Sequence, residues 1–424
     1  MRARVAAGLM AFAGVASAGE LEFHPYASGL YLYDSNVYKF SSQVADVTGT
    51  TDTSDRVERY TAGLDAGYAW EQQKVHATAE ARRFLFEDFS HLDHNEYALD
   101  IGLDGKALSN TTGLLDFRDE RRMASFEDRR STQLIIERDR MGRGELTIAV
   151  TPDWHVVAGA RLHTLRSPLP DAPALPQPPP GAAARVASPN FAMHETAYNA
   201  GVQRGILRKE HSENEAPLFV GVMLGYQTVS FSGVTPQPPP PPGVSQEKFD
   251  GYRLLSLEAT AKYDISELSA FDGKLGVTQY RPRESAGGSR LELTGELGYT
   301  RSLSEVTELN LHVFRRIAPY AATGDASTNT GISVGAKWQP MLRDLIVLVN
   351  YSWASSSFGG SSGFAPENSG RGDTVQTATL SLAHPLFRYF AIRLFGSYSD
   401  RHSNRAFDSY ADKIVGAELA FRWP

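Results

Sequence analysis

The sequence predicts an all-β protein, a transmembrane antiparallel up-and-down β-barrel of about 18 strands. Three observations carry this prediction. Apolar and polar residues alternate in segments that recur from residue 21 to the end, the connections between segments alternate between short and long, and Tyr and Trp gather at the segment ends. Successive side chains of a strand point to opposite faces, so the alternation gives each strand one apolar and one wetter face.

The amino terminus has the pattern of an export signal. Two arginines within the first four residues precede an apolar run over 5–15, and Ala16-Ser17-Ala18 follows. A basic start, a short apolar run and a small-residue cleavage site are typical of a secretory signal peptide. The run is too short to span a bilayer as a helix. We therefore expect residues 1–18 to be a signal peptide and residues 19–424 to form an outer-membrane barrel.

Composition agrees with this class. Hydrophobic residues make up 42% of the chain, Gly occurs 37 times and the formal net charge is -7. A barrel that is apolar only on its outer face needs no greater hydrophobicity. The acidic balance argues against nucleic acid as a partner. Cysteine is absent from the sequence, which excludes disulfides and thiolate metal sites.

The alternation defines the individual strands. In the last one, Val415, Leu419 and Trp423 share one parity, while Glu418 and Arg422 share the other. The same reading along the chain predicts eighteen strands, an even number as in bacterial single-chain barrels. They lie near 21–34, 56–71, 73–87, 93–106, 111–123, 132–150, 155–167, 191–208, 216–232, 248–265, 270–283, 288–303, 306–319, 327–339, 343–358, 372–385, 387–400 and 409–424. The strand near 111–123 is the one with the poorest pattern.

The connections fall into two classes. Short ones occur near 71–73, 108–110, 151–153, 264–268, 303–305, 340–344 and 384–387. Longer ones occur at 42–55, 168–190, 233–247, 320–326, 359–371 and 401–408. Short periplasmic turns and long extracellular loops are the asymmetry of an outer-membrane barrel.

Aromatic residues recur at the ends of the apolar sets: Tyr60, Trp70, Trp338, Tyr351, Trp353, Tyr398 and Trp423. Rings with an apolar body and a polar tip favour the bilayer interface, so the sequence predicts two aromatic girdles.

The opposite face predicts a polar lumen. An unpaired backbone amide in hydrocarbon costs several kcal/mol, so the sheet must close on itself. Eighteen strands leave room for water inside. The inward polar set, our candidate solute contacts, is Asp65, Glu80, Arg82, Asp100, Asp104, Arg161, Glu258, Lys262, Glu292, Glu296, Lys337, Arg393, Glu418 and Arg422. Two interpretations stay open: a hydrated wall held by its own salt bridges, or a conduit that selects a polar, saccharide-like solute.

Two predicted extracellular loops, 168–190 and 233–247, are rich in proline. Proline favours an extended polyproline helix. These loops either dip into the mouth as a constriction or stand in solvent as spacers.

Candidate catalytic, metal and cofactor sites are not found in the sequence. His91 and His94 lie three residues apart, and we expect them to be solvated loop residues. The tripeptide Arg371-Gly372-Asp373 is expected to be a chance match. The chain is therefore expected not to be an enzyme, although a barrel hydrolase or acyltransferase is a further alternative.

Three stretches carry a family resemblance. The opening strand, the first of them, runs Pro25-Tyr26-Ala27-Ser28-Gly29-Leu30-Tyr31-Leu32-Tyr33-Asp34-Ser35-Asn36-Val37-Tyr38. The second is Ser125-Phe126-Glu127-Asp128 followed by Glu137-Arg138-Asp139-Arg140, and the third is Thr151-Pro152-Asp153-Trp154-His155-Val156-Val157-Ala158-Gly159-Ala160-Arg161. Together they resemble EpsL-type outer-membrane barrels from exopolysaccharide clusters. The Pro-rich loops and Pro424, which follows Trp423 where barrels often end on an aromatic residue, depart from that pattern.

The resemblance implies export or assembly of an extracellular polysaccharide through a hydrated, charged lumen. The alternative is a general diffusion porin for small polar solutes. Expected partners are outer-membrane lipid, the barrel-assembly machinery, the polysaccharide or small solute, and periplasmic export proteins. The expected location is the outer membrane of a Gram-negative bacterium.

Overall fold

A computed structural model describes residues 20–44, 52–127, 132–168, 190–206, 218–232, 251–266, 268–283, 289–320, 325–340, 344–358 and 370–423. These residues form one antiparallel sheet of eighteen strands. The strands are β1 (Glu20–Asp34), β2 (Asp55–Trp70), β3 (Gln73–Phe86), β4 (His94–Leu108), β5 (Thr111–Met123), β6 (Ile136–Ala149), β7 (Trp154–Pro168), β8 (Asn190–Ile206), β9 (Leu218–Ser232), β10 (Gly251–Ser266), β11 (Ser269–Pro282), β12 (Arg290–Ser304), β13 (Thr307–Tyr320), β14 (Asp325–Trp338), β15 (Ile346–Phe358), β16 (Gly372–Phe387), β17 (Phe390–Ser403) and β18 (Tyr410–Arg422).

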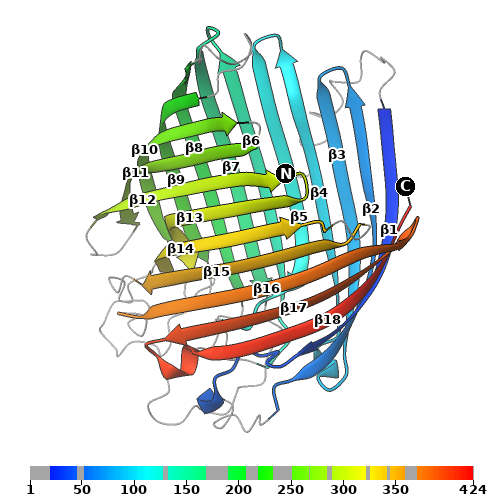
Figure 1. Cartoon of the computed structure of the whole chain (residues 1–424). Helices are drawn as coiled ribbons and strands as arrows, with labels where there is room; N and C mark the ends of the chain where they lie inside the picture. Colours follow the sequence, from blue (N-terminus) through cyan, green and yellow to red (C-terminus); the bar gives the residue numbers. More distant parts are fainter. Residues whose placement is uncertain are drawn as a thin grey trace, which may run out of the picture.

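The sheet closes into a barrel. Each strand pairs with its neighbours in sequence, and β1 pairs with β18 over residues 26–34 and 414–422. The closure is visible where the blue β1 meets the red β18 (Figure 1). Each strand begins and ends within four residues of the range expected from the sequence. The predicted fold class, an all-β antiparallel up-and-down barrel, is confirmed.

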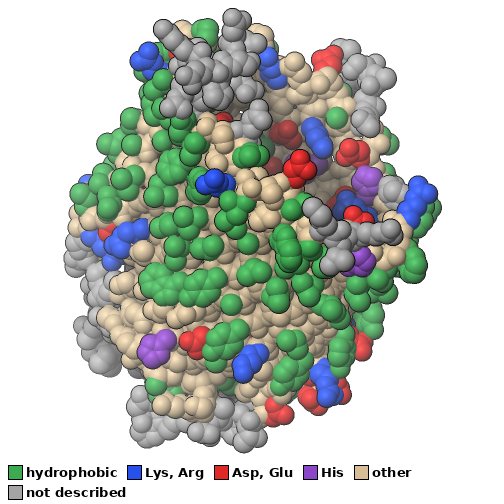
Figure 2. Space-filling model, viewed as in Figure 1, with side chains coloured by type: hydrophobic (Ala, Val, Ile, Leu, Met, Phe, Trp, Pro, Cys, Tyr) green, Lys and Arg blue, Asp and Glu red, His purple; other side chains and the backbone are tan. Residues whose placement is uncertain are grey.

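The strand register separates two faces. Leu115, Leu162, Leu224 and Leu293 are each close to 58% exposed, although they are large and apolar. They lie on one continuous face, because directly paired residues of adjacent strands point to the same side of the sheet. Apolar side chains cover much of the outer surface seen in Figure 2. Such a face is stable only against lipid or another apolar partner.

The predicted aromatic residues lie on this outward face. Trp70, Trp338 and Trp423 stand near the end of the barrel where most connections are short, and Tyr60 and Tyr398 stand nearer the other end. We call these ends the short-turn end and the long-loop end. The connection 207–217 is an exception to the rule, because it is long and yet belongs to the short-turn end.

Residues 35–44 fold into the mouth at the long-loop end. Val37, Tyr38 and Phe40 are buried there against inward side chains of the barrel, including Val57 and Phe86. A second buried apolar cluster, which includes Val229, Tyr252 and Tyr280, lies on the inner wall near the long-loop ends of β9–β11. Apolar packing therefore narrows this end of the lumen.

Some predictions fall on residues that the structure does not describe. These are the signal peptide at 1–18, the Pro-rich stretches at 169–189 and 233–247, and Pro424. No helix within the described part of the chain is long and apolar enough to cross a membrane.

Candidate functional site

All of the predicted lumen residues lie on the inward face. In β10, for example, Leu255 and Leu257 are about half exposed on the outside, so Glu258 and Lys262 point to the opposite side. Direct pairing between neighbouring strands extends this assignment of inward and outward faces to all the remaining strands. The contacts among these side chains differ from one part of the wall to another.

A network of ion pairs lines the wall from β3 to β6. Arg82 contacts Glu80 on its own strand, Glu96 on β4 at 3.5 Å and Glu120 on β5 at 3.6 Å. Arg122 then joins Glu120 at 3.4 Å to Glu137 on β6 at 2.9 Å. Glu80, Glu96 and Glu120 each have more than one cationic or hydrogen-bonding partner, as buried charges require.

The same network continues to β8. Arg122 Nη2 lies 3.4 Å from Asp139, and His163 Nε2 on β7 lies 2.8 Å from the same carboxylate. The other ring nitrogen of His163 lies 3.5 Å from Glu195 on β8, which also pairs with the predicted lumen residue Arg161. This third of the wall is therefore a cross-linked layer of alternating charge rather than a set of free charges.

Two further clusters involve predicted residues that are far apart in sequence. Glu418 accepts Arg393 at 2.6 Å and Arg59 at 3.2 Å. Arg422 lies 3.0 Å from Asp65. Arg393 and Glu418 are directly paired on the consecutive strands β17 and β18. Closure of the barrel creates the other two pairs, because β1 pairs with both β18 and β2 and so brings these two strands close together.

The remaining predicted residues are more separate. Glu296 contacts His312 at 2.7 Å and Lys274 at 3.3 Å, whereas Glu292 contacts Arg290 at 2.8 Å. Asp100 and Asp104 both lie about 4 Å from His76, at 3.9 and 4.0 Å. Within the described residues, Glu258, Lys262 and Lys337 take part in no ion pair.

Burial of the inward charges changes along the barrel axis. Toward the short-turn end, the side chains of Asp100 and Asp104 are 48% and 50% exposed. Toward the long-loop end, those of Glu120 and Glu195 are 6% and 4% exposed. Figure 2 shows a hollowed opening at its upper right with acidic, basic and His side chains inside. The inward charges are thus open to solvent toward the short-turn end and buried toward the other end.

The wall formed by β14–β17 has a different chemistry. Ser333, Ser352, Thr377 and Ser399 are paired directly in a row across these four strands. Thr377 and Ser399 join their hydroxyl groups at 3.1 Å. The next row toward the short-turn end contains Asn350, Thr379 and Ser397, again in direct register. We call these two rows the hydroxyl rows; they carry hydrogen-bonding groups without charge.

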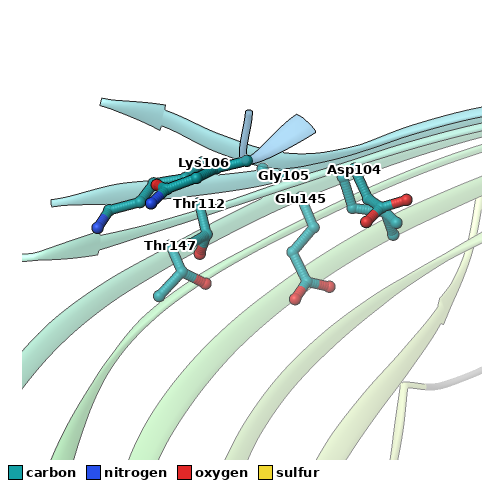
Figure 3. A pocket seen from close by; sticks show the side chains of 9 residues that line it. Asp104, Gly105, Lys106, Thr112, Glu145 and Thr147 are labelled. Atoms are coloured by element: carbon teal, nitrogen blue, oxygen red, sulfur yellow. The ribbon is translucent and has the colours of Figure 1, made fainter. Parts of the chain in front are cut away.

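A pocket of about 550 Å³ opens at the short-turn end between β4, β5 and β6. In Figure 3, Thr112, Glu145 and Thr147 point to the same side, and Asp104 lies beside them. Gly105, at φ 145, lets the strand approach the β2–β3 turn, since a Cβ there would stand 2.3 Å from the Gln72 carbonyl oxygen. Two carboxylates and two hydroxyls thus line one hollow at this mouth.

The long-loop end holds a buried ionic cluster. Arg371 is fully buried and donates to both oxygens of Asp373, at 3.1 and 2.6 Å. Asp373 also accepts Arg401 at 2.6 Å and the Ser403 hydroxyl at 2.6 Å. Arg371 and Asp373 therefore tie the start of β16 to β17. The expectation that the tripeptide is a chance match stays a prediction.

The expectation of solvated histidines is half right. His91 is exposed, but His94 is 5% exposed and stacks on Phe84 with ring centroids 4.8 Å apart. His94 is buried because it lies on the inward parity of β4, where Glu96 and the Leu92 carbonyl satisfy its ring nitrogens. Tyr38 belongs to the buried apolar group at the same end of the barrel. Its burial and the nearby Asp55 carboxylate raise the pKa of the Tyr38 phenol to about 12.

Several charged wall residues were absent from the predicted set, among them Arg59, Glu96, Glu120, Asp139 and Glu195. Each of them occupies an alternate position of its strand that points inward, so the alternation could have identified them once the strand bounds are known. In the described part of the chain, no group of three or more His, Asp or Glu side chains is arranged to hold a metal ion.

No protein-family model and no curated protein sequence matches the chain. Among solved structures it is similar to the siderophore receptor PirA from Acinetobacter baumannii (8% identity, TM-score 0.48, 95% of this chain and 80% of that one). It is also similar to the outer membrane protein OpdK from Pseudomonas aeruginosa (11% identity, TM-score 0.43, 95% and 99%).

A third similar structure is the ferric enterobactin receptor PfeA from Pseudomonas aeruginosa (9% identity, TM-score 0.47, 95% and 80%). At these values the similarity carries no argument about function. The assignment of the fold rests on the strand pairing of this chain itself. The resemblance to EpsL-type barrels has no support from the comparisons and stays a prediction.

Proposed function

We propose that this protein is an outer-membrane channel through which small polar solutes diffuse. The observation that carries the proposal is the combination of a closed eighteen-stranded barrel, an apolar outward face and a charged, hydrated inner wall. Barrels of this strand number leave an aqueous channel. The outward face needs lipid, and the inward face needs water.

The geometry also supports a division of roles inside the lumen. The solvent-open short-turn end admits solute, and the narrow long-loop end, where Tyr38 and Tyr252 are buried, limits its size. The charges of β3–β8 hold one another, so they act mainly as an ordered hydrated wall. The polarity of this wall excludes apolar solutes, because these would displace water from charged groups.

Liposome swelling tests the proposal. Vesicles containing the refolded protein should swell in isotonic arabinose and glucose, more slowly in a disaccharide, and very slowly in a large oligosaccharide. The matched control is the heat-denatured protein in the same lipid. Swelling rates equal to those of empty vesicles for every sugar would refute the diffusion channel.

The hydroxyl rows favour a second candidate, passage of an extracellular polysaccharide. A sugar polymer presents many hydroxyl groups, and Ser333, Ser352, Thr377 and Ser399 offer matching neutral donors and acceptors along one wall. Many weak hydrogen bonds that exchange easily would let a polymer slide without being trapped. This function is what the resemblance to EpsL-type barrels implies.

A strain lacking the protein separates the two candidates. An export conduit predicts that polysaccharide disappears from the medium and accumulates in the periplasm. A strain carrying Ser352→Val and Thr377→Val should show part of the same defect, while Ala354→Val on the same wall should not. Unchanged secretion in the deletion strain would leave the diffusion channel as the remaining proposal.

A further inference from the structure

A row of arginines crosses the outward face of β5, β6 and β7 near the long-loop end. Arg121 pairs directly with Arg138, and Arg138 pairs directly with Arg166. Residues paired directly across antiparallel strands have Cβ atoms about 4.5–5.5 Å apart, and like charges at that distance repel. Three guanidinium groups, here called the arginine row, therefore stand side by side on the same face as the exposed Phe117 and Leu162.

The positive charge of this patch is only partly balanced. Asp119 accepts both Arg138, with Nε at 2.8 Å, and Arg140, with Nε at 3.1 Å. Arg121 and Arg166 are exposed, and neither makes a side-chain hydrogen bond or ion pair with any described residue. Among the residues that the structure describes, the patch thus sets four guanidinium groups against one carboxylate.

The arginine row lies at the level expected for lipid headgroups. Tyr97 on β4 is the direct neighbour of Arg121, and the Arg138 guanidinium carbon lies 5.9 Å from the Tyr97 ring centroid. Tyr favours the interface between hydrocarbon and headgroups. Toward the middle of the barrel the outward residues become apolar, with Leu99, Phe117 and Leu162.

We propose that the arginine row binds the phosphate groups of a phosphorylated glycolipid of the lipid A type in the outer leaflet. Guanidinium groups bind phosphate oxygens in a bidentate manner, and anionic phosphates remove the repulsion within the row. Adjacent strands are about 4.8 Å apart, so the row spans about 10 Å. One phosphodiester headgroup does not cover that span, whereas a lipid with two phosphates does.

The inference rests on the proposed placement of the barrel in the outer membrane. It is tested on the full barrel refolded in detergent, with bis-phosphorylated lipid A in the same detergent as the probe. Phosphatidylglycerol and inorganic phosphate are separate arms, and isothermal titration gives each affinity. Lipid A should bind more tightly than either of the others.

The variants Arg121→Gln and Arg166→Gln remove charges that have no carboxylate partner among the described residues, so folding is preserved. Each basic residue near a membrane surface contributes about a fivefold gain in affinity for anionic lipid, and the double variant should therefore bind lipid A about 30-fold more weakly. Arg204→Gln is the matched control: Arg204 is exposed on the outward face of β8, at the short-turn end, with its guanidinium 5.7 Å from the Trp154 ring. It should leave the affinity unchanged.

Heat-modifiable gel mobility checks that each variant is folded. Unchanged lipid A affinity in the folded double variant would overturn the inference, and so would an equal loss of affinity for phosphatidylglycerol, since that would show no preference for the glycolipid. The double variant should keep the conductance of the wild type, because the row faces away from the lumen. A wild-type barrel that binds lipid A as expected but conducts no ions would refute the channel while supporting the arginine row.

Discussion

Reversing two lumen lysines should change the ion selectivity of the channel. Lys262 on β10 and Lys337 on β14 are exposed on the inward face, and neither takes part in an ion pair with another described residue. Replacing either by Glu therefore leaves no stranded partner charge. The variants Lys262→Glu and Lys337→Glu test whether the inward face is the path of the ions.

The magnitude follows from Coulomb's law. A monovalent ion that passes about 8 Å from a unit charge in water interacts with it by about 0.5 kcal/mol, and screening at 0.1 M salt halves this to about 0.25 kcal/mol. Reversing one lysine changes the wall by two charges, which favours a cation by about 0.5 kcal/mol and disfavours an anion equally. The ratio of cation to anion permeability should rise about fivefold for each variant.

The assay is the reversal potential of single channels in a planar bilayer under a KCl gradient. The matched control is Lys413→Glu, which makes the same charge change at an exposed position on the outward face of β18. The control should keep the wild-type reversal potential. If both lumen variants conduct normally and also keep that potential, the lysines do not face the ion path and the assignment of the lumen is refuted.

Three further predictions concern stability. Gly251→Ala should lower the free energy of unfolding by about 2 kcal/mol, because Gly251 has φ 126 and a Cβ would stand 1.9 Å from the Val229 carbonyl oxygen. Urea titration measures this change. Gly372→Ala is the neutral control, because the added carbon would have no atom within 4 Å. Arg371→Met should cost about 3 kcal/mol, because it takes one of the two arginines from the buried Asp373, and an unchanged urea midpoint would contradict the role given to that cluster. Stability should also fall as pH rises from about 10 to about 12, since Tyr38 keeps its proton in the folded state up to a pKa of about 12 and loses it near pH 10 when unfolded. Tyr38→Phe should lose this component of the pH dependence, and identical pH profiles for the two proteins would show that Tyr38 is not buried as described.

The strands were predictable because their signal is local. Alternation in β10, β12 and β18 reports directly on a sheet with lipid on one side and water on the other. The alternation was poorest in β5, and the structure gives the reason. Asp119 and Arg121 are charged residues on the outward face of β5, so both faces near its end are polar. The same residues belong to the patch that contains the arginine row.

The contacts of the lumen were not predictable, because strand register and barrel closure set them. Nothing in the spacing of Asp65 and Arg422 indicates that they lie 3.0 Å apart. The apolar packing at the mouth of the long-loop end was not predicted either. Tyr38 is buried by Val57 and Phe126, which follow it at different distances in the chain, so no local pattern reports the contact. Parity gave the direction of each side chain, and the register of eighteen strands was needed to give its neighbours.

Single-channel recording of the unmodified protein tests the central claim most directly. The refolded barrel, added to a planar lipid bilayer in KCl, should insert and give discrete, repeated conductance steps, as expected of a water-filled lumen. A protein that inserts as a folded, heat-modifiable barrel and yet leaves the bilayer electrically silent at every voltage would contradict the account, because its lumen would then be closed.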